Sequence, residues 1–213
     1  MGCSNYVSWW PCIEGEAISG DEFETLRTEF EAAVRDKQNR YRALGIRLKA
    51  AYRVVNASLD EDFEAKRAVL GRLGKSDSVS RLYHGTRAQS AKSIIKNGFR
   101  LPQHAGMFGK GIYFADTPLK SLQYTRSSFW GTRVILACDV VLGNTMVTHK
   151  PAKHLQAGSS GFERAWLLQL LGQKSFDSVT AASGWFSAVR VPEYVVYNTA
   201  QTVPRYVLIV EQH

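Results

Sequence analysis

Apolar residues in the first part of the chain recur three or four positions apart. From residue 19 to residue 55 these positions hold Phe23, Leu26, Phe30, Val34, Tyr41, Leu44, Leu48, Tyr52 and Val55. The run Ser19-Gly20-Asp21-Glu22, which precedes them, has the side chains of a helix capping box. The pattern predicts one long amphipathic helix.

A second capping box, Ser58-Leu59-Asp60-Glu61, precedes apolar residues at 63, 69, 70 and 73. It predicts a shorter helix that ends at Gly74. The two helices form a predicted helical hairpin over residues 19–76, after an irregular N-terminal arm over residues 1–18. Their apolar stripes need a covering surface, which is either the rest of this chain, a second copy or another partner.

After residue 77 the pattern changes to short apolar runs bounded by glycine and polar residues. Strands are predicted at 81–85, 112–114, 134–142, 176–179, 193–197 and 206–210, and helices at 88–97 and 162–171. Many short strands with a few short helices are typical of an α+β fold. We therefore expect a third unit, over residues 77–213, that is built on two packed sheets.

One strand-to-helix turn in this unit carries candidate chemistry. Its parts are a strand at 112–114, an N-cap at Asp116 or Thr117, Pro118 at the first helical position and a helix through Tyr124. This geometry brings Tyr113 and Tyr124 towards each other, with the hydroxyl of Ser121 between them. Such a slot suits a planar ring that bears an amide, such as nicotinamide. The alternative is that both tyrosines pack in the core.

The composition is that of a globular protein, because 45% of the 213 residues are hydrophobic and no apolar run is long enough to span a membrane. The first 30 residues lack the basic start and apolar block of a secretory signal. The predicted location is therefore intracellular, cytoplasmic or nuclear. Cys3, Cys12 and Cys138 have no metal-ligand spacing and leave one thiol unpaired in any disulfide scheme. Gly2 and Cys3 are candidates for acylation, although Tyr6 departs from the motif.

The formal net charge of +8 is concentrated in the second part of the chain. Residues 1–80 carry a net charge of −1, whereas residues 81–213 carry a net charge of +9. A basic surface of this kind fits a dinucleotide diphosphate substrate, an acidic acceptor or non-specific contact with nucleic acid. Its alternative role is to keep the protein soluble.

Three stretches together resemble a known family of catalytic domains. They are LYHGT at 82–86, GMFGKGIYFADTPLKSLQY at 106–124 and PEYVVYNTAQTVPRYVLIV at 192–210. Their order, spacing and flanking residues resemble the poly(ADP-ribose) polymerase-like ADP-ribosyltransferases, with the diphtheria-toxin-like triad of histidine, tyrosine and glutamate. The likeness covers roughly residues 80–213. It implies the ADP-ribosyltransferase fold, with two packed split β-sheets, and NAD⁺ as a substrate that is used without a metal.

The resemblance assigns the catalytic roles to His84, Tyr113 and Glu193. Glu193 would bond a ribose hydroxyl and stabilise the oxocarbenium character that develops as the bond between nicotinamide and ribose breaks. Nicotinamide leaves as a neutral molecule from a cationic ring, so no general acid is required and one carboxylate can suffice. His84 would hold the ribose on the adenosine side through its ring nitrogens.

The same resemblance implies further contacts with NAD⁺. The main chain of Gly85 would bond the carboxamide of nicotinamide, and Ser121 would donate to the carboxamide carbonyl. Tyr113 and Tyr124 would enclose the ring. The set is completed by Thr86 at the ribose or phosphate side and by Lys120 and Met107 as candidates for substrate contact.

The predicted function is transfer of ADP-ribose from NAD⁺ to protein side chains, with mono and poly transfer both open. Three alternatives stay open as well: an NAD⁺ glycohydrolase or toxin that uses water, a transferase that modifies nucleic-acid ends, and a module that binds NAD⁺ or ADP-ribose without turnover. Relatives of the nuclear polymerases carry a helical subdomain that can block the NAD⁺ site. Inhibition by residues 19–76 is therefore a further hypothesis.

Overall fold

The structure, a computed structural model, describes residues 15–41, 46–125, 132–151, 153, 176–184 and 189–212. Within these ranges the strands form one sheet with the order β1-β2-β9-β5-β3-β4-β8-β7-β6. The strands are β1 (Gly15–Ala17), β2 (Ile46–Val54), β3 (Val79–Gly85), β4 (Ile112–Ala115), β5 (Thr132–Val141), β6 (Thr145–Thr148), β7 (Ser178–Ala181), β8 (Glu193–Val196) and β9 (Thr202–Gln212). The helices are α1 (Gly20–Tyr41), α2 (Ala57–Arg72), α3 (Ala88–Asn97), α4 (Pro118–Leu122) and the short 3₁₀ helix η1 (Thr199–Gln201). The predicted α+β class is confirmed.

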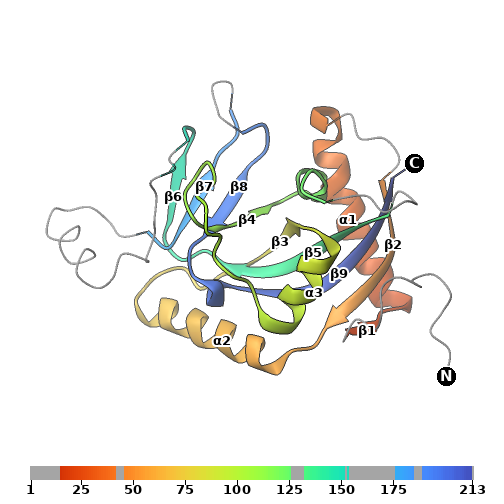
Figure 1. The fold of residues 1–213 in the computed structure, drawn as a ribbon, viewed down its shortest axis with the longest axis horizontal. Coiled ribbons are helices and arrows are strands. Elements are labelled where there is room, and N and C mark those ends of the chain that lie inside the picture. The colour runs from red at the N-terminus through yellow and green to blue at the C-terminus, as the bar shows by residue number, and fades with distance from the viewer. Residues whose placement is uncertain are drawn as a thin grey trace, which may run out of the picture.

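The sheet is split between β3 and β4. These two strands pair at one position only, Tyr83↔Ala115. By contrast, β3 pairs with β5 along its whole length, and β4 pairs with β8 along its whole length. The sheet therefore consists of a first half, β1-β2-β9-β5-β3, and a second half, β4-β8-β7-β6, which Figure 1 shows diverging from each other.

Helices cover both faces of the first half. On one face, Leu26 and Phe30 of α1 pack with a cluster that includes Leu208 of β9. On the other face, Ala91 and Ile95 of α3 pack with a cluster from the same strands. Figure 1 shows α1 and α3 on opposite sides of β5 and β9. Two-sided burial explains why β5 and β9 are continuous apolar runs rather than alternating ones.

The prediction of one helix from residue 19 to residue 55 is wrong beyond α1, because residues 46–54 form strand β2. β2 pairs with β9, so part of the expected helical hairpin belongs to the sheet. The apolar positions that extended the helical pattern, Leu48, Tyr52 and Val55, lie in different environments. Leu48 is buried in the cluster with α1, Tyr52 packs against the cluster on the other face of the sheet, and Val55 is 67% exposed. A bulge, a shift of register between Leu48 and Ala50, puts Leu48 and Tyr52 on opposite faces although they are four residues apart.

The second predicted helix is present as α2, and its N-cap is Asn56 rather than a residue of the predicted capping box. The Asn56 side chain accepts a hydrogen bond from the main-chain N–H of Leu59 at 3.3 Å. Phe63 and Leu70 of α2 are fully buried against Val141 and Val203. The apolar stripes of α1 and α2 are thus covered by this chain's own sheet.

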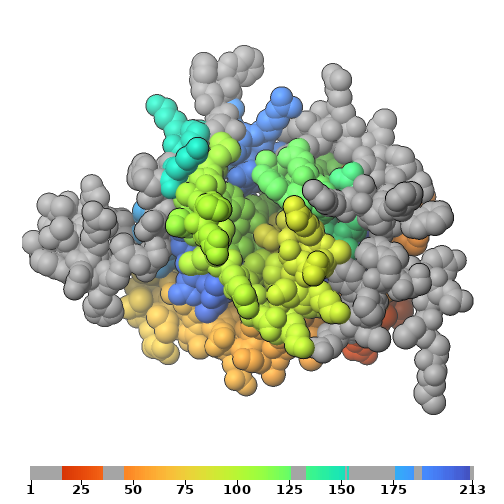
Figure 2. All heavy atoms as spheres, in the orientation of Figure 1, coloured from red at the N-terminus to blue at the C-terminus, as the bar shows by residue number. Residues whose placement is uncertain are grey.

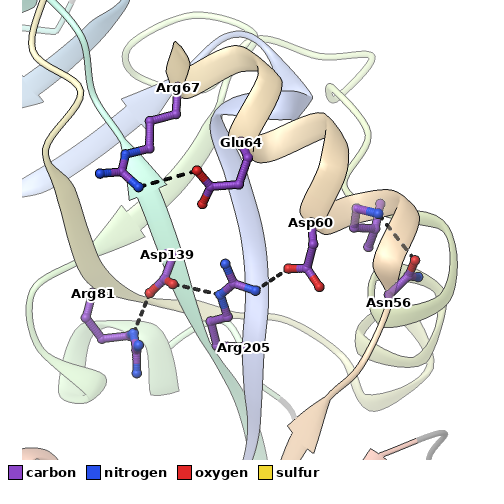
Figure 3. A network of polar contacts seen from close by, with 8 residues as sticks. Asn56, Asp60, Glu64, Arg67, Arg81, Asp139 and Arg205 are labelled. Atoms are coloured by element: carbon purple, nitrogen blue, oxygen red, sulfur yellow. Dashed lines mark hydrogen bonds and ion pairs between the residues drawn. The ribbon is translucent and has the colours of Figure 1, made fainter. Parts of the chain in front are cut away.

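Ion pairs also tie α2 to the sheet (Figure 3). Asp139 of β5 accepts from Arg81 of β3 and from Arg205 of β9, each at 2.7 Å. Arg205 also pairs with Asp60 of α2, and its guanidinium lies 5.8 Å from the ring centroid of Phe63. One carboxylate therefore holds two arginines, one of which contacts α2.

Several further elements differ from the predictions. α4 ends at Leu122, before Tyr124, because the N–H groups of Gln123 and Tyr124 bond carbonyls three residues back and tighten the last turn. β9 begins at Thr202, since Pro204 is accommodated where the register with β5 shifts. β1 and β6 were not predicted, and β1 lies within the expected irregular arm. The predicted helix at 162–171, like Gly2 and Cys3, lies outside the described residues.

Replacing Asp139 with alanine should lower the free energy of unfolding by about 1–3 kcal/mol, because the partly buried arginines lose their shared acceptor. Urea denaturation followed by circular dichroism measures this loss. The matched control is Glu64→Ala, which removes an exposed pair within α2, Glu64–Arg67, and should cost less than about 1 kcal/mol. Equal losses in the two variants would show that the network does not hold α2 to the sheet.

Candidate active site

A cavity of about 710 Å³ opens at the split between β3 and β4. Its walls come from β3, α3, the loop over residues 99–111, β4, α4 and the first residue of β8. Figure 2 shows the surface hollowed between this loop, α3 and α4. All residues predicted for the site line this one cavity, namely Glu193, His84, Tyr113, Gly85, Thr86, Ser121, Tyr124, Lys120 and Met107.

Glu193 lies at the narrowest part of the split. Strand pairing aligns it with Ala115 of β4, which is itself paired with Tyr83 of β3. Glu193 is buried, with 5% of the residue's surface exposed, and its Oε1 lies 2.8 Å from Nζ of Lys120 in α4. A buried carboxylate with a cationic partner is thus available to a bound molecule at this point.

His84 joins the two edges of the split. Its Nδ1 lies 2.9 Å from the main-chain carbonyl of Tyr113 in β4. Its ring packs edge-on against Phe99, with 5.0 Å between the centroids. Burial lowers the pKa of His84, and the hydrogen bond to Tyr113 opposes that shift. Because a carbonyl only accepts, Nδ1 carries the proton of the neutral ring, which leaves Nε2 as an acceptor.

Gly85 and Ser121 bring β3 and α4 into direct contact. The Ser121 hydroxyl is buried and donates to the main-chain carbonyl of Tyr83 at 3.0 Å. A Cβ atom on Gly85 would lie 1.8 Å from the carbonyl oxygen of Ser121, so only glycine fits there. In this structure the single hydroxyl proton of Ser121 is thus directed at Tyr83, and it would have to turn to donate to a ligand.

Contacts at both ends hold α4 in place. The Thr117 hydroxyl accepts from the N–H of Leu119 as the N-cap, and it also donates to the carbonyl of Ala33 in α1 at 2.9 Å. Pro118 follows at the first helical position, as predicted. At the other end, Arg133 of β5 donates to the carbonyl of Leu122 at 3.1 Å. These contacts fix the backbone that carries Lys120 and Ser121.

The two tyrosines of the predicted slot lie in different environments. Tyr113 is half-buried, and burial raises the pKa of its phenol to about 12. Tyr124 is 59% exposed, and its ring centroid lies 5.6 Å from Nζ of Lys120. Tyr113 therefore provides a fixed wall of the cavity, whereas Tyr124 lies at its mouth.

Sequence reasoning missed several lining residues, which are Ser90, Ser93 and Ile94 of α3 and Arg100, Pro102 and His104 of the following loop. The two serines three positions apart on one helix face were the available signal. Among the described residues, the lining includes none from α1 or α2. Both helices pack on the sheet instead.

Several known proteins are similar in sequence to a large part of this chain. The sequence is 26% identical over 159 residues to the poly [ADP-ribose] polymerase tankyrase of Caenorhabditis elegans, which covers 62% of this chain and 7% of that protein. It is 29% identical over 147 residues to human protein mono-ADP-ribosyltransferase PARP4, and this match covers 64% of this chain and 8% of that protein. It is 31% identical over 153 residues to human poly [ADP-ribose] polymerase 2, and this match covers 61% of this chain and 26% of that protein.

The chain therefore spans between 7% and 26% of the length of these three relatives. The sequence profile of the poly(ADP-ribose) polymerase catalytic domain matches residues 20–212. The match includes α1, β2 and α2 as well as the three stretches that line the cavity. The chain belongs to the poly(ADP-ribose) polymerase catalytic domain family.

Proposed function

We propose that this protein is an ADP-ribosyltransferase that moves ADP-ribose from NAD⁺ to protein side chains and releases nicotinamide. The observation that carries the proposal is the convergence of His84, Tyr113 and Glu193, from three different strands, on one cavity of about 710 Å³. A cavity of this volume is within the range of small-molecule and cofactor sites. Two relatives named as polymerases and one named as a mono-transferase support the same chemistry.

The reaction breaks the bond between C1′ of the ribose and the ring nitrogen of nicotinamide. The bonding electrons stay with the nicotinamide ring, which becomes neutral, and positive charge develops on the ribose. The Glu193 carboxylate stabilises this charge and bonds a ribose hydroxyl. An acceptor oxygen or nitrogen then bonds to C1′ and loses its proton. Lys120, 2.8 Å from Glu193, orients the carboxylate.

The split between the strands provides the binding groups. Past the single pair with β4, no strand of the described residues lies beside Gly85 on the cavity side of β3, so its main chain can bond a carboxamide. Tyr113 and Tyr124 enclose the nicotinamide ring, and Ser121 contacts its carboxamide. His84 accepts from a ribose hydroxyl at Nε2, while Thr86 and Met107 border the bound dinucleotide.

A second acceptor class is favoured by one observation. Residues 78–115 contain six lysines and arginines and no acidic residue, and this segment forms much of the cavity wall. Such a surface also suits the phosphates of a nucleic acid. A reaction of the protein with labelled NAD⁺, a protein mixture and an oligonucleotide separates the possibilities. Label on protein supports the proposal, whereas label on nucleic acid or as free ADP-ribose favours an alternative.

Other features stay predictions. The length of the product, one ADP-ribose or many, depends on how an acceptor is held. The intracellular location likewise stays a prediction. Among the described residues, no helix is both long and apolar enough to cross a membrane.

Replacing Glu193 with glutamine should lower kcat for nicotinamide release by at least about 100-fold, with little change in the KM for NAD⁺, because the carboxylate acts mainly at the transition state. Steady-state release of nicotinamide measures both constants. Glu211→Gln is the control, since it removes a carboxylate that pairs with Lys49 on the sheet and does not line the cavity. Near-normal turnover by the Glu193 variant would exclude the proposed role.

Replacing Gly85 with alanine should abolish detectable binding of NAD⁺, because the new Cβ would lie 1.8 Å from the carbonyl oxygen of Ser121 and force α4 away from β3. Calorimetry measures the binding, and thermal unfolding verifies that the variant is folded. The control variant is Gly71→Ala, in α2. Its new Cβ would lie 3.4 Å from a carboxylate oxygen of Asp77. It should bind NAD⁺ normally and gain stability by about 0.5–1 kcal/mol. Normal binding by the Gly85 variant would contradict the close contact.

The KM for NAD⁺ should stay constant as the pH is lowered from 8 to about 6.5, and it should rise only below the ordinary pKa of histidine. The reason is that burial lowers the pKa of His84, so Nε2 keeps its acceptor role in this range. A pH profile of KM tests this expectation. A rise that begins near pH 7 would mean that His84 is protonated more readily than its burial allows.

A further inference from the structure

The loop over residues 99–111 forms one wall of the cavity and contains a tight turn, Gly106–Gly109. Gly106 and Gly109 exchange two main-chain hydrogen bonds, at 3.0 and 3.3 Å. Gly109 has a φ of 89°, which favours glycine. A Cβ atom on Gly106 would lie 2.5 Å from the phenol oxygen of Tyr113. The turn is therefore closed on itself and in close contact with Tyr113.

Phe108, within this turn, is anchored in the second half of the sheet. Its side chain is fully buried in a cluster with Val179, Val195 and Tyr197. Its main-chain N–H donates to the phenol oxygen of Tyr113 at 2.9 Å. Its carbonyl accepts from the phenol of Tyr197 at 2.5 Å. Both main-chain groups of a buried residue are thus bonded by tyrosine side chains rather than by a strand.

The Tyr113 phenol also donates to the carbonyl of Gly109 at 2.9 Å. Its single proton is therefore used, and Tyr197 supplies the bond to the Phe108 carbonyl. Tyr197 follows β8, is buried and is not among the residues that line the cavity. It therefore contacts the turn without lining the cavity itself.

We propose that Tyr197 is a positioning residue for NAD⁺ binding: its hydroxyl, together with that of Tyr113, clamps the Gly106–Gly109 turn so that the turn forms a fixed wall of the cavity. The inference rests on the proposed function for its effect on NAD⁺. Burial raises the pKa of both phenols, which keeps them protonated and able to donate.

Loss of the Tyr197 hydroxyl leaves the Phe108 carbonyl buried without a partner. An unpaired buried carbonyl is costly, so the turn gains by moving towards water. Met107 belongs to the same turn, so it moves with Phe108. It lines the cavity and is 37% exposed. The wall then no longer matches the bound substrate, which weakens binding and leaves Glu193 in place.

The first test compares Tyr197→Phe with Tyr206→Phe in nicotinamide release. Both changes remove one hydroxyl that donates a hydrogen bond, but the Tyr206 hydroxyl donates to Glu22 of α1 and Tyr206 does not line the cavity. Tyr197→Phe should raise the KM for NAD⁺ by about 3–10-fold and leave kcat within about twofold. Tyr206→Phe should change neither constant. An unchanged KM in the Tyr197 variant would overturn the link to NAD⁺.

The second test needs no turnover, so it stands even if the proposed function fails. Hydrogen exchange, read by mass spectrometry, should be faster by about 3–10-fold in peptides that cover residues 106–109 of Tyr197→Phe, and not in Tyr206→Phe. Equal exchange in the two variants would overturn the clamp. Because both phenols hold Phe108, the KM effects of Tyr113→Phe and Tyr197→Phe should also be non-additive, and additive effects would count against a shared turn.

Discussion

The constraint on which this structure depends is the single pair, Tyr83↔Ala115, that joins β3 to β4. A second or third pair would close the sheet and use the main-chain groups of Gly85 in a ladder. Divergence after one pair leaves those groups facing the cavity instead. Glu193 of β8 lies at the same point, because it pairs with Ala115 of β4. The catalytic carboxylate of the proposed mechanism is thus placed by strand register rather than by a loop.

An open edge of this kind needs other bonds to keep its geometry. The structure supplies them from side chains to main chain: His84 to the carbonyl of Tyr113, Ser121 to the carbonyl of Tyr83, and Tyr197 to the carbonyl of Phe108. Each is within the normal range of hydrogen-bond distances. A ladder would fix neighbouring strands about 4.8 Å apart, whereas beyond their single pair β3 and β4 are joined by the bond from His84 to Tyr113. The other two bonds position α4 and the turn at Phe108, so the walls of the cavity depend on these side chains.

The sequence predicted which residues would lie together around one cavity better than it predicted the edge of the sheet, for physical reasons. His84, Tyr113, Ser121 and Glu193 lie in contiguous motifs, and the capped turn at Thr117 and Pro118 is local chemistry. β2 was mistaken for a helix because Leu48, Tyr52 and Val55 continue the spacing of three and four residues, although they do not share one buried face. The clamp on Phe108 joins positions 89 residues apart in the chain, and no local pattern predicts such a contact.

The residues that join the halves of the sheet are also those assigned to the chemistry. α4 is fixed to the first half through Ser121 and α1, yet its Lys120 pairs with Glu193 of the second half. His84 belongs to the first half and bonds the second. A dinucleotide that contacts His84, Lys120 and Glu193 would therefore contact both halves at once. Binding would favour one distance between them, so the proposed substrate itself would complete the geometry that a single strand pair leaves open.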